Sequence, residues 1–177
     1  IILAQDTHLI AQLHGIRAIL GNILQPDECW MLDGRLPTVT LRMNRQSKNA
    51  QRIAETLATH PKILKVHYPT LIEDPEQIRI RNAQCHFPGA IFSFELKGGK
   101  SAAFDFLRNL QIGRNAVSLG GVETLVCHPA TTTHSEMSDE DKRSSGVTDS
   151  LVRVSIGIED WRDLLHDFHQ ALDAVKG

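Results

Sequence analysis

The chain has 177 residues, enough for one ordinary domain and a part of another, and 41% of them are hydrophobic, enough for a core. Its formal net charge of −2 gives no basic footprint that would argue for nucleic-acid binding. No apolar run approaches the roughly 18 residues that cross a bilayer. Three widely spaced cysteines, Cys29, Cys85 and Cys127, favour a reducing, cytoplasmic location over a disulfide framework.

The first residues, IILAQDTHLI, carry neither an initiator methionine nor the pattern of a signal peptide. Ile1, Ile2 and Leu3 predict a buried strand entered midway, and therefore a piece of a longer chain. From about Thr7 to Leu24 apolar residues recur at intervals of three and four, which predicts a helix that Pro26 ends.

The middle of the chain alternates helices and strands of irregular length, without an internal repeat. The predicted elements are a helix over about Thr38 to Thr59, a short strand in ILKVHYP, a helix in DPEQIRIRNAQC, a strand in GAIFSFEL and, after a break at Gly98 and Gly99, a helix from Ser101.

Two short extended stretches, NAVSL and TLVCHP, flank the glycine pair Gly120 and Gly121. SDED starts a short helix that Gly146 stops, and LVRVSIG predicts a strand. The closing helix is strongly amphipathic, with one narrow apolar face made of Trp161, Leu164, Leu165, Phe168, Leu172 and Val175.

These elements predict an α+β fold with a mostly antiparallel sheet and helices on one face. We assign residues 37–177 to this domain. Residues 1–36 are predicted to be the incomplete end of a preceding domain together with a long linking helix.

Arg153 stands in the middle of an apolar strand. Burial of an always-charged guanidinium is costly unless a planar anion meets its donors, so either a structural carboxylate or a ligand is expected to pair with it.

The other unusual segment is AVSLGGVETLVCHPATTTH, residues 116–134, with its two glycines and a dense polar cluster that ends at His134. Spacing alone favours a hydrogen-bonded loop over the sheet, and a carboxylate-binding site made of Ser118 and Arg153 is the alternative.

Other kinds of site find little support. Among the nine histidines, His166 and His169 are three apart on the last helix but lack a third ligand nearby, and no metal site is predicted. No serine lies in G-x-S-x-G, and no glycine-rich phosphate loop is followed by Lys-Ser/Thr.

The segments SLGGVETLVCHPATTTH and GVTDSLVRVSIGIEDWRDLLHDFHQAL resemble the C-terminal domain of the cystathionine γ-synthase family, the pyridoxal-phosphate enzymes of cysteine and methionine metabolism. Upstream, LRMNRQSKNAQRIAETL, KVHYP and PGAIFSFELKGG resemble the same family, so the likeness covers nearly the whole chain. It implies the C-terminal small domain of a fold-type I enzyme, with residues 1–36 as the end of the large cofactor-binding domain. One departure is Gly34-Arg35, where the family usually has Arg-Gly.

The resemblance also implies roles for individual residues. The family arginine that matches Arg153 binds the substrate α-carboxylate, the serine that matches Ser118 lies beside it, and the threonine that matches Thr133 lies at the edge of the pocket. Val117 and Leu119 flank this serine and are assigned to the same substrate site. Cystathionine-handling members tend to carry glutamate at the position of Val117, so valine there favours a methionine γ-lyase-like or O-acyl-homoserine sulfhydrylase-like activity, by γ-elimination or γ-replacement. Cystathionine γ-synthase or lyase activity is the alternative, and a non-catalytic domain used for assembly is another.

None of the seven lysines has the family's S-x-T-K context for the Schiff base with the cofactor. The resemblance therefore implies that pyridoxal phosphate is bound by a missing N-terminal part, and that these 177 residues hold no catalytic or cofactor-binding residue and are inactive alone. It further implies a cytoplasmic homo-oligomer, a dimer of dimers, that acts on a sulfur amino acid or an O-acyl-homoserine and binds neither nucleic acid nor membrane.

Overall fold

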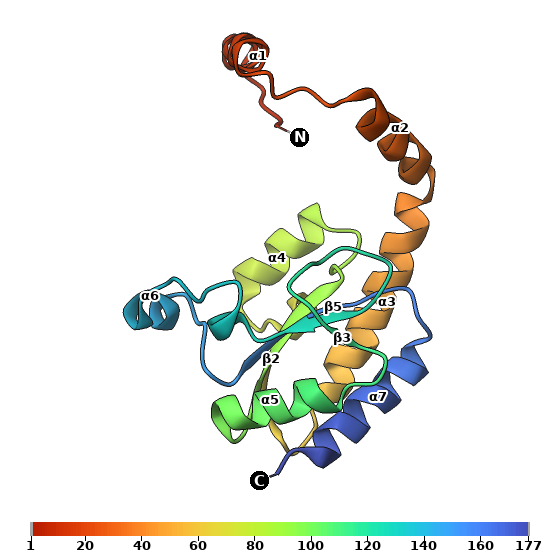
Figure 1. Cartoon of the computed structure of the whole chain (residues 1–177), viewed down its shortest axis with the longest axis vertical. Helices are drawn as coiled ribbons and strands as arrows, with labels where there is room; N and C mark the ends of the chain where they lie inside the picture. Colours follow the sequence, from red (N-terminus) through yellow and green to blue (C-terminus); the bar gives the residue numbers. More distant parts are fainter. Residues whose placement is uncertain (1, 177) are drawn as a thin grey trace. The chain divides into compact units, whose positions relative to one another are not determined.

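A five-stranded sheet forms the centre of the larger of two units in the computed structural model, which describes residues 2–176 (Figure 1). The two units are Ile1–Val39 and Thr40–Gly177.

The first unit contains the helices α1 (Thr7–Leu20) and α2 (Pro26–Arg35) and the 3₁₀ turn η1 (Leu36–Thr38). The predicted helix to Leu24 is wrong at its end, because Gly21 adopts a left-handed conformation, φ 74°, and closes α1. Pro26 starts α2 rather than ending α1, since proline has no N–H to leave unsatisfied in the first turn of a helix.

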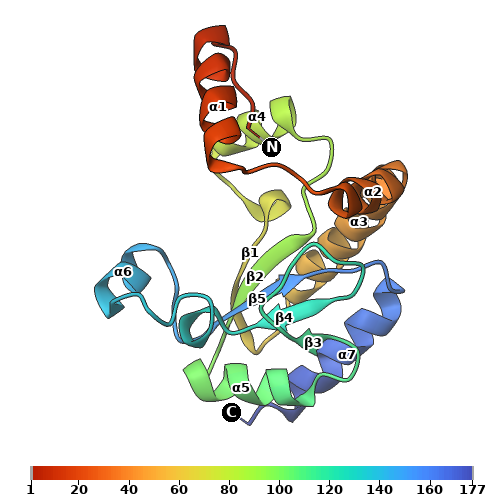
Figure 2. The same cartoon turned by 45° about the horizontal axis from the view of Figure 1, so that its top comes forward.

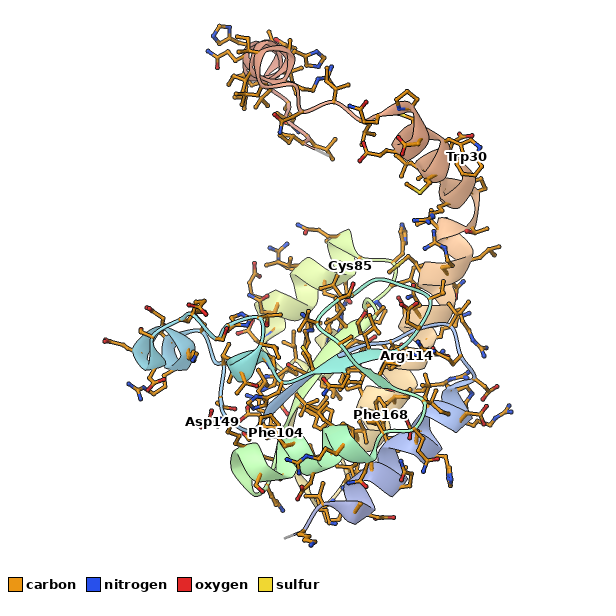
Figure 3. The ribbon with its side chains drawn as sticks, viewed as in Figure 1. Trp30, Cys85, Phe104, Arg114, Asp149 and Phe168 are labelled. Atoms are coloured by element: carbon orange, nitrogen blue, oxygen red, sulfur yellow. The ribbon has the colours of Figure 1, made fainter. Side chains whose placement is uncertain are left out.

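No residue of α1 or α2 is buried, and Trp30 of α2 is 77% exposed (Figure 3). The predicted buried strand at the start of the chain is wrong for Ile2 and Leu3, which lie outside any strand and are 70% and 88% exposed. All strands of the described residues belong to the second unit. Ile1, the third residue of that prediction, lies outside the described residues.

The second unit follows the predicted order of elements closely. It contains α3 (Val39–Leu57, entered from the first unit), β1 (Ile63–His67), η2 (Pro69–Leu71), α4 (Pro75–Gln84), β2 (Ile91–Leu96), α5 (Gly99–Asn109), β3 (Arg114–Asn115), β4 (Leu125–Cys127), η3 (Pro129–Thr131), α6 (Asp139–Ser144), β5 (Leu151–Ser155) and α7 (Trp161–Ala174). The helix predicted from Ser101 begins two residues earlier, with Gly98 as its N-cap.

The strands lie in the order β1-β2-β5-β4-β3, and every neighbouring pair is antiparallel except β3 with β4. The α3, α5 and α7 helices bury their apolar residues in one core with the sheet, and α5 packs beside α7 (Figure 1, Figure 2). The predicted α+β fold, with a mostly antiparallel sheet and helices on one face, is confirmed.

Alternation along the two central strands decides what faces this core. Phe94 of β2 lies opposite Val152 of β5, and both are fully buried. Phe94 also meets Phe106 of α5 edge-on, with ring centroids 5.3 Å apart. Because successive side chains of a strand point to opposite faces, Arg153 lies on the other face of the sheet.

A buried carboxylate of α7 fixes the turn from α5 into β3. Asp167 is 2% exposed, and its two oxygens accept hydrogen bonds from the N–H groups of Gln111, Ile112 and Gly113 at 2.8–2.9 Å. Arg114 follows directly as the first residue of β3 (Figure 3). The predicted extended stretch NAVSL is wrong beyond Asn115, because the chain leaves the sheet after the N–H of Ala116 donates to Val126.

Tyr68 joins α3 to the start of β2. Its hydroxyl donates to the carbonyl oxygen of Gly89 at 2.9 Å and lies 3.4 Å from that of Ser47. Burial raises the pKa of Tyr68 well above its ordinary value, so the hydroxyl stays protonated and keeps these bonds in the physiological pH range.

Candidate functional site

Arg153 lies in the middle of β5, a central strand, on the face of the sheet opposite to Phe94 and Val152. One terminal nitrogen, Nη2, donates to the carbonyl oxygens of Val117 at 2.7 Å and Ser118 at 3.0 Å. Its Nε is buried and has no hydrogen-bond partner among the described residues. No carboxylate within residues 2–176 forms an ion pair with Arg153. Carbonyl dipoles thus orient the guanidinium, and no carboxylate of the described chain neutralises its charge.

The segment that supplies these two carbonyls, Val117–Gly121, is called the carbonyl loop below. Gly120 has φ 78°, a conformation that a residue with a Cβ rarely adopts, and its N–H donates to Oγ of Ser155 at 3.0 Å. The carbonyl oxygen of Gly121 accepts a hydrogen bond from Nε2 of Gln46 on α3 at 2.7 Å. The loop is therefore tied to β5 at both of its ends.

A second set of hydrogen bonds anchors the residues after the loop. The carboxylate of Glu159 accepts from both the N–H and the hydroxyl of Thr124, at 2.6 and 2.9 Å. The same hydroxyl accepts from the N–H of Gly157 at 2.9 Å, and the N–H of Ile158 donates to Val122 at 2.8 Å. The turn from β5 to α7 and the end of the loop segment thus form one hydrogen-bonded unit.

Gly157 lies where this unit is most tightly packed. A Cβ at this position would overlap the carbonyl oxygen of Val122 and the carbonyl carbon of Glu123, which are main-chain atoms that cannot rotate away. We expect Gly157→Ala to lower the free energy of unfolding of its unit by about 1–2 kcal/mol, as overpacking does. The control is Gly15→Ala, because a Cβ there meets nothing within 4 Å. Urea unfolding that left the Gly157→Ala midpoint unchanged would contradict this packing.

The polar cluster after Pro129 mostly bonds within itself. His128 is buried, and its ring nitrogens lie 2.9 Å from Oγ1 of Thr131 and 2.9 Å from the carbonyl oxygen of Asp149. Its ring also meets Phe104 edge-on, in the part of the unit where Phe104 and Asp149 are labelled (Figure 3). Thr133 is exposed, and its hydroxyl pairs with the adjacent His134 at 2.8 Å. No hydrogen bond joins Thr133 to Arg153 in the described part of the chain.

The structure therefore joins some of the predicted site residues and separates others. Arg153 meets Val117 and Ser118 through their main chain, while the side chains of Val117, Ser118 and Leu119 are exposed. Gln46 and Ser155 contact the loop and the strand but were not predicted as site residues. The burial of Gln46 could have been predicted, because this residue continues at helical spacing the α3 stripe made of Ala50, Ile53, Ala54 and Leu57. In the structure Gln46 is 1% exposed.

The Nζ atom of Lys62 is occupied at the end of α7, where it donates to the carbonyl oxygens of Leu172, Asp173 and Val175. Among residues 2–176 no group of three His, Cys, Asp or Glu side chains is placed to hold a metal ion. The helices in the same range are all too short or too polar to cross a membrane.

The family model described as Cys/Met metabolism PLP-dependent enzyme matches residues 1–173. The L-methionine gamma-lyase of Pseudomonas putida is 42% identical over 163 residues, which are 92% of this chain and 41% of the relative. A cystathionine beta-lyase of Bacillus subtilis is 37% identical over 171 residues, 97% of this chain and 43% of the relative. The solved structure of cystathionine gamma-lyase from Lactobacillus plantarum, complexed with L-serine, matches with a TM-score of 0.90 and 31% identity, over 98% of this chain and 45% of that chain. The chain thus spans less than half the length of these relatives.

Proposed function

The chain belongs to the Cys/Met metabolism PLP-dependent enzyme family, and we propose that it supplies the site for the substrate α-carboxylate in a complete enzyme of sulfur amino-acid metabolism. By complete enzyme we mean this chain joined to a cofactor-binding part that precedes it. The proposal assigns residues 37–177 to the C-terminal small domain and residues 1–36 to the end of the large domain. The division of the described fold at Val39 supports that assignment.

One observation carries the carboxylate assignment. The guanidinium of Arg153 is fixed by the carbonyl oxygens of Val117 and Ser118, and its buried Nε lacks a partner among the described residues. A buried donor without an acceptor costs free energy, and a cation without an anion costs more. A substrate carboxylate carries one negative charge and its oxygens are strong acceptors, so a carboxylate oxygen bound at Nε would remove both penalties.

Holding the carboxylate gives the chain a role in the chemistry. Pyridoxal phosphate supplies the electron sink for the bonds at the substrate α-carbon. Arg153 fixes the direction in which the α-carboxylate points, and thereby decides which α-carbon bond is presented to the cofactor. Ser118 lies beside this position, and Thr133 is assigned to the edge of the same pocket.

The proposed reaction is γ-elimination from methionine or γ-replacement on an O-acyl-homoserine. The apolar side chain of Val117 supports this choice, since it is 52% exposed next to the carbonyl that orients Arg153. It offers a thioether or an ester an apolar surface and offers a distal ammonium no partner. Breakdown of cystathionine is the second candidate, and it is favoured by the relatives named as cystathionine lyases.

Location and assembly complete the proposal. All three cysteines are free thiols, Cys29 and Cys85 exposed and Cys127 buried, which suits the cytoplasm. We propose that the complete enzyme is a homo-oligomer, a dimer of dimers, as the likeness to the family implies.

The division of labour between the two parts is open to a direct test. The 177-residue chain, mixed with pyridoxal phosphate and dialysed, is expected to retain none of the visible absorbance of a lysine Schiff base. Borohydride treatment should leave no lysine stoichiometrically labelled, because the lysine and the phosphate cradle belong to the other part. The methionine gamma-lyase of Pseudomonas putida, treated in parallel, is the positive control. Stoichiometric labelling of a single lysine in this chain would contradict the proposal.

A further inference from the structure

Gln46 of α3 is almost completely buried, 1% exposed, and still leaves one of its own polar atoms unpaired. Its Nε2 donates to the carbonyl oxygen of Gly121 at 2.7 Å and to that of Ile156 at 3.0 Å. Its Oε1 is buried without a hydrogen-bond partner among residues 2–176. Rotating the amide by 180° would set Oε1 against these two carbonyl oxygens, which cannot donate a hydrogen bond, so the two hydrogen bonds fix the orientation of the amide.

The two acceptors of Gln46 belong to the two segments that build the Arg153 site. Gly121 ends the carbonyl loop, and Ile156 directly follows β5, three residues beyond Arg153. A single amide group therefore sets the distance between the loop and the strand at this end. Ser155 makes a parallel tie, because its Oγ accepts from the N–H of Gly120 at 3.0 Å. At the other end of the loop, Arg153 itself holds Val117 and Ser118.

We propose that Gln46, together with Ser155, is a positioning residue that sets the affinity of the Arg153 site for a carboxylate by clamping the carbonyl loop onto β5. The inference rests on the proposed function of Arg153 as the carboxylate anchor. The unpaired, buried Oε1 of Gln46 lowers the stability of the fold. The Nε2 atom of the same amide donates one hydrogen bond to the loop and one to the residue that follows the strand. Neither Gln46 nor Ser155 donates to or accepts from Arg153, so both act through the loop.

The chain offers a closely matched control for Gln46. Ser47 is the next residue of α3, is also 1% exposed, and has a buried hydroxyl without a partner among the described residues. Ser47→Ala therefore removes a buried polar group from the same turn without touching the loop. Gln46→Met keeps the length of the side chain and removes both donors. Ser155→Ala removes only the acceptor of Gly120, and it tests the clamp if Gln46→Met fails to fold.

The first measurement is amide hydrogen exchange of this chain. In Gln46→Met and in Ser155→Ala the N–H of Gly120 is expected to exchange about threefold to tenfold faster, relative to the N–H groups of β2, as the loss of one hydrogen bond gives. Ser47→Ala should leave this ratio unchanged. If the role of these residues were purely structural, the N–H of Gly120 and the N–H groups of β2 would exchange faster by the same factor. That outcome would overturn the proposal.

The second measurement is the KM for L-methionine in the complete enzyme. Gln46→Met and Ser155→Ala are expected to raise KM about threefold to tenfold, with unchanged cofactor absorbance, and Ser47→Ala to match wild type. If Arg153→Lys changes nothing, the proposed function itself is wrong. If Arg153→Lys weakens binding while the folded Gln46 and Ser155 variants behave like Ser47→Ala, the carboxylate site stands and the clamp is wrong.

Discussion

Replacing Arg153 by lysine in the complete enzyme is expected to weaken substrate binding by about tenfold or more. The guanidinium donates to two carbonyl oxygens through Nη2, and its buried Nε has no hydrogen-bond partner among the described residues. A lysine ammonium is a single point of charge on a flexible stem and cannot reproduce this planar fork. The measurement is kcat/KM and the substrate dissociation constant, with the cofactor absorbance as a check that the enzyme is intact.

Arg108→Lys is the matched control for this substitution. Arg108 is exposed on α5, one of the helices that cover the opposite face of the sheet, and it pairs with Asp105 at 3.0 Å. The control should keep wild-type kinetics. Unchanged kinetics in a folded Arg153→Lys enzyme would mean that the substrate carboxylate binds elsewhere.

Val117→Glu in the complete enzyme is expected to shift preference from methionine or an acylated homoserine toward cystathionine. A buried, unpaired ammonium is costly, whereas a methylthio group loses little on burial, so a glutamate partner helps only the substrate that carries a distal amino group. The ratio of kcat/KM for cystathionine to that for methionine should rise about tenfold to a hundredfold, equivalent to roughly 1–3 kcal/mol.

Val117→Gln separates charge from size in this test, because it has the same length as glutamate without the negative charge. Its effect on the ratio should be small. A folded Val117→Glu enzyme with the wild-type ratio would show that residue 117 does not contact the far end of the substrate. Wild-type preference for cystathionine would refute the assigned activity directly.

The fold was largely predictable because its packing pattern is local. Leu164, Phe168 and Leu172 recur on one face of α7 and are fully buried, and the apolar run of β5 marks a central strand. The pattern fails at Val117 and Leu119, which are apolar but 52% and 53% exposed, and the extended stretch that it predicts there is a loop. Periodicity assumes that apolar residues are buried, and nothing in the sequence marks these two as exceptions.

The site was only partly predictable, because its contacts use main-chain atoms. The sequence singled out Arg153 by its charge in an apolar strand, but its observed partners are carbonyl oxygens, which every residue has. Gln46 reaches the loop from 75 residues away in the sequence, and no local rule gives that pairing. Thr133 was placed in the pocket by resemblance, and the described contacts neither bring it to Arg153 nor assign it another ligand-binding role.

The most direct test of the Arg153 assignment is a crystal structure of the complete enzyme with L-norleucine, which has a carboxylate and no sulfur. The predicted result is a norleucine carboxylate oxygen within about 3 Å of Nε of Arg153, the length of a charge-assisted hydrogen bond. The contradicting result is a norleucine carboxylate bound away from Arg153, with Nε still unpaired or held by a carboxylate from the cofactor-binding part of the enzyme.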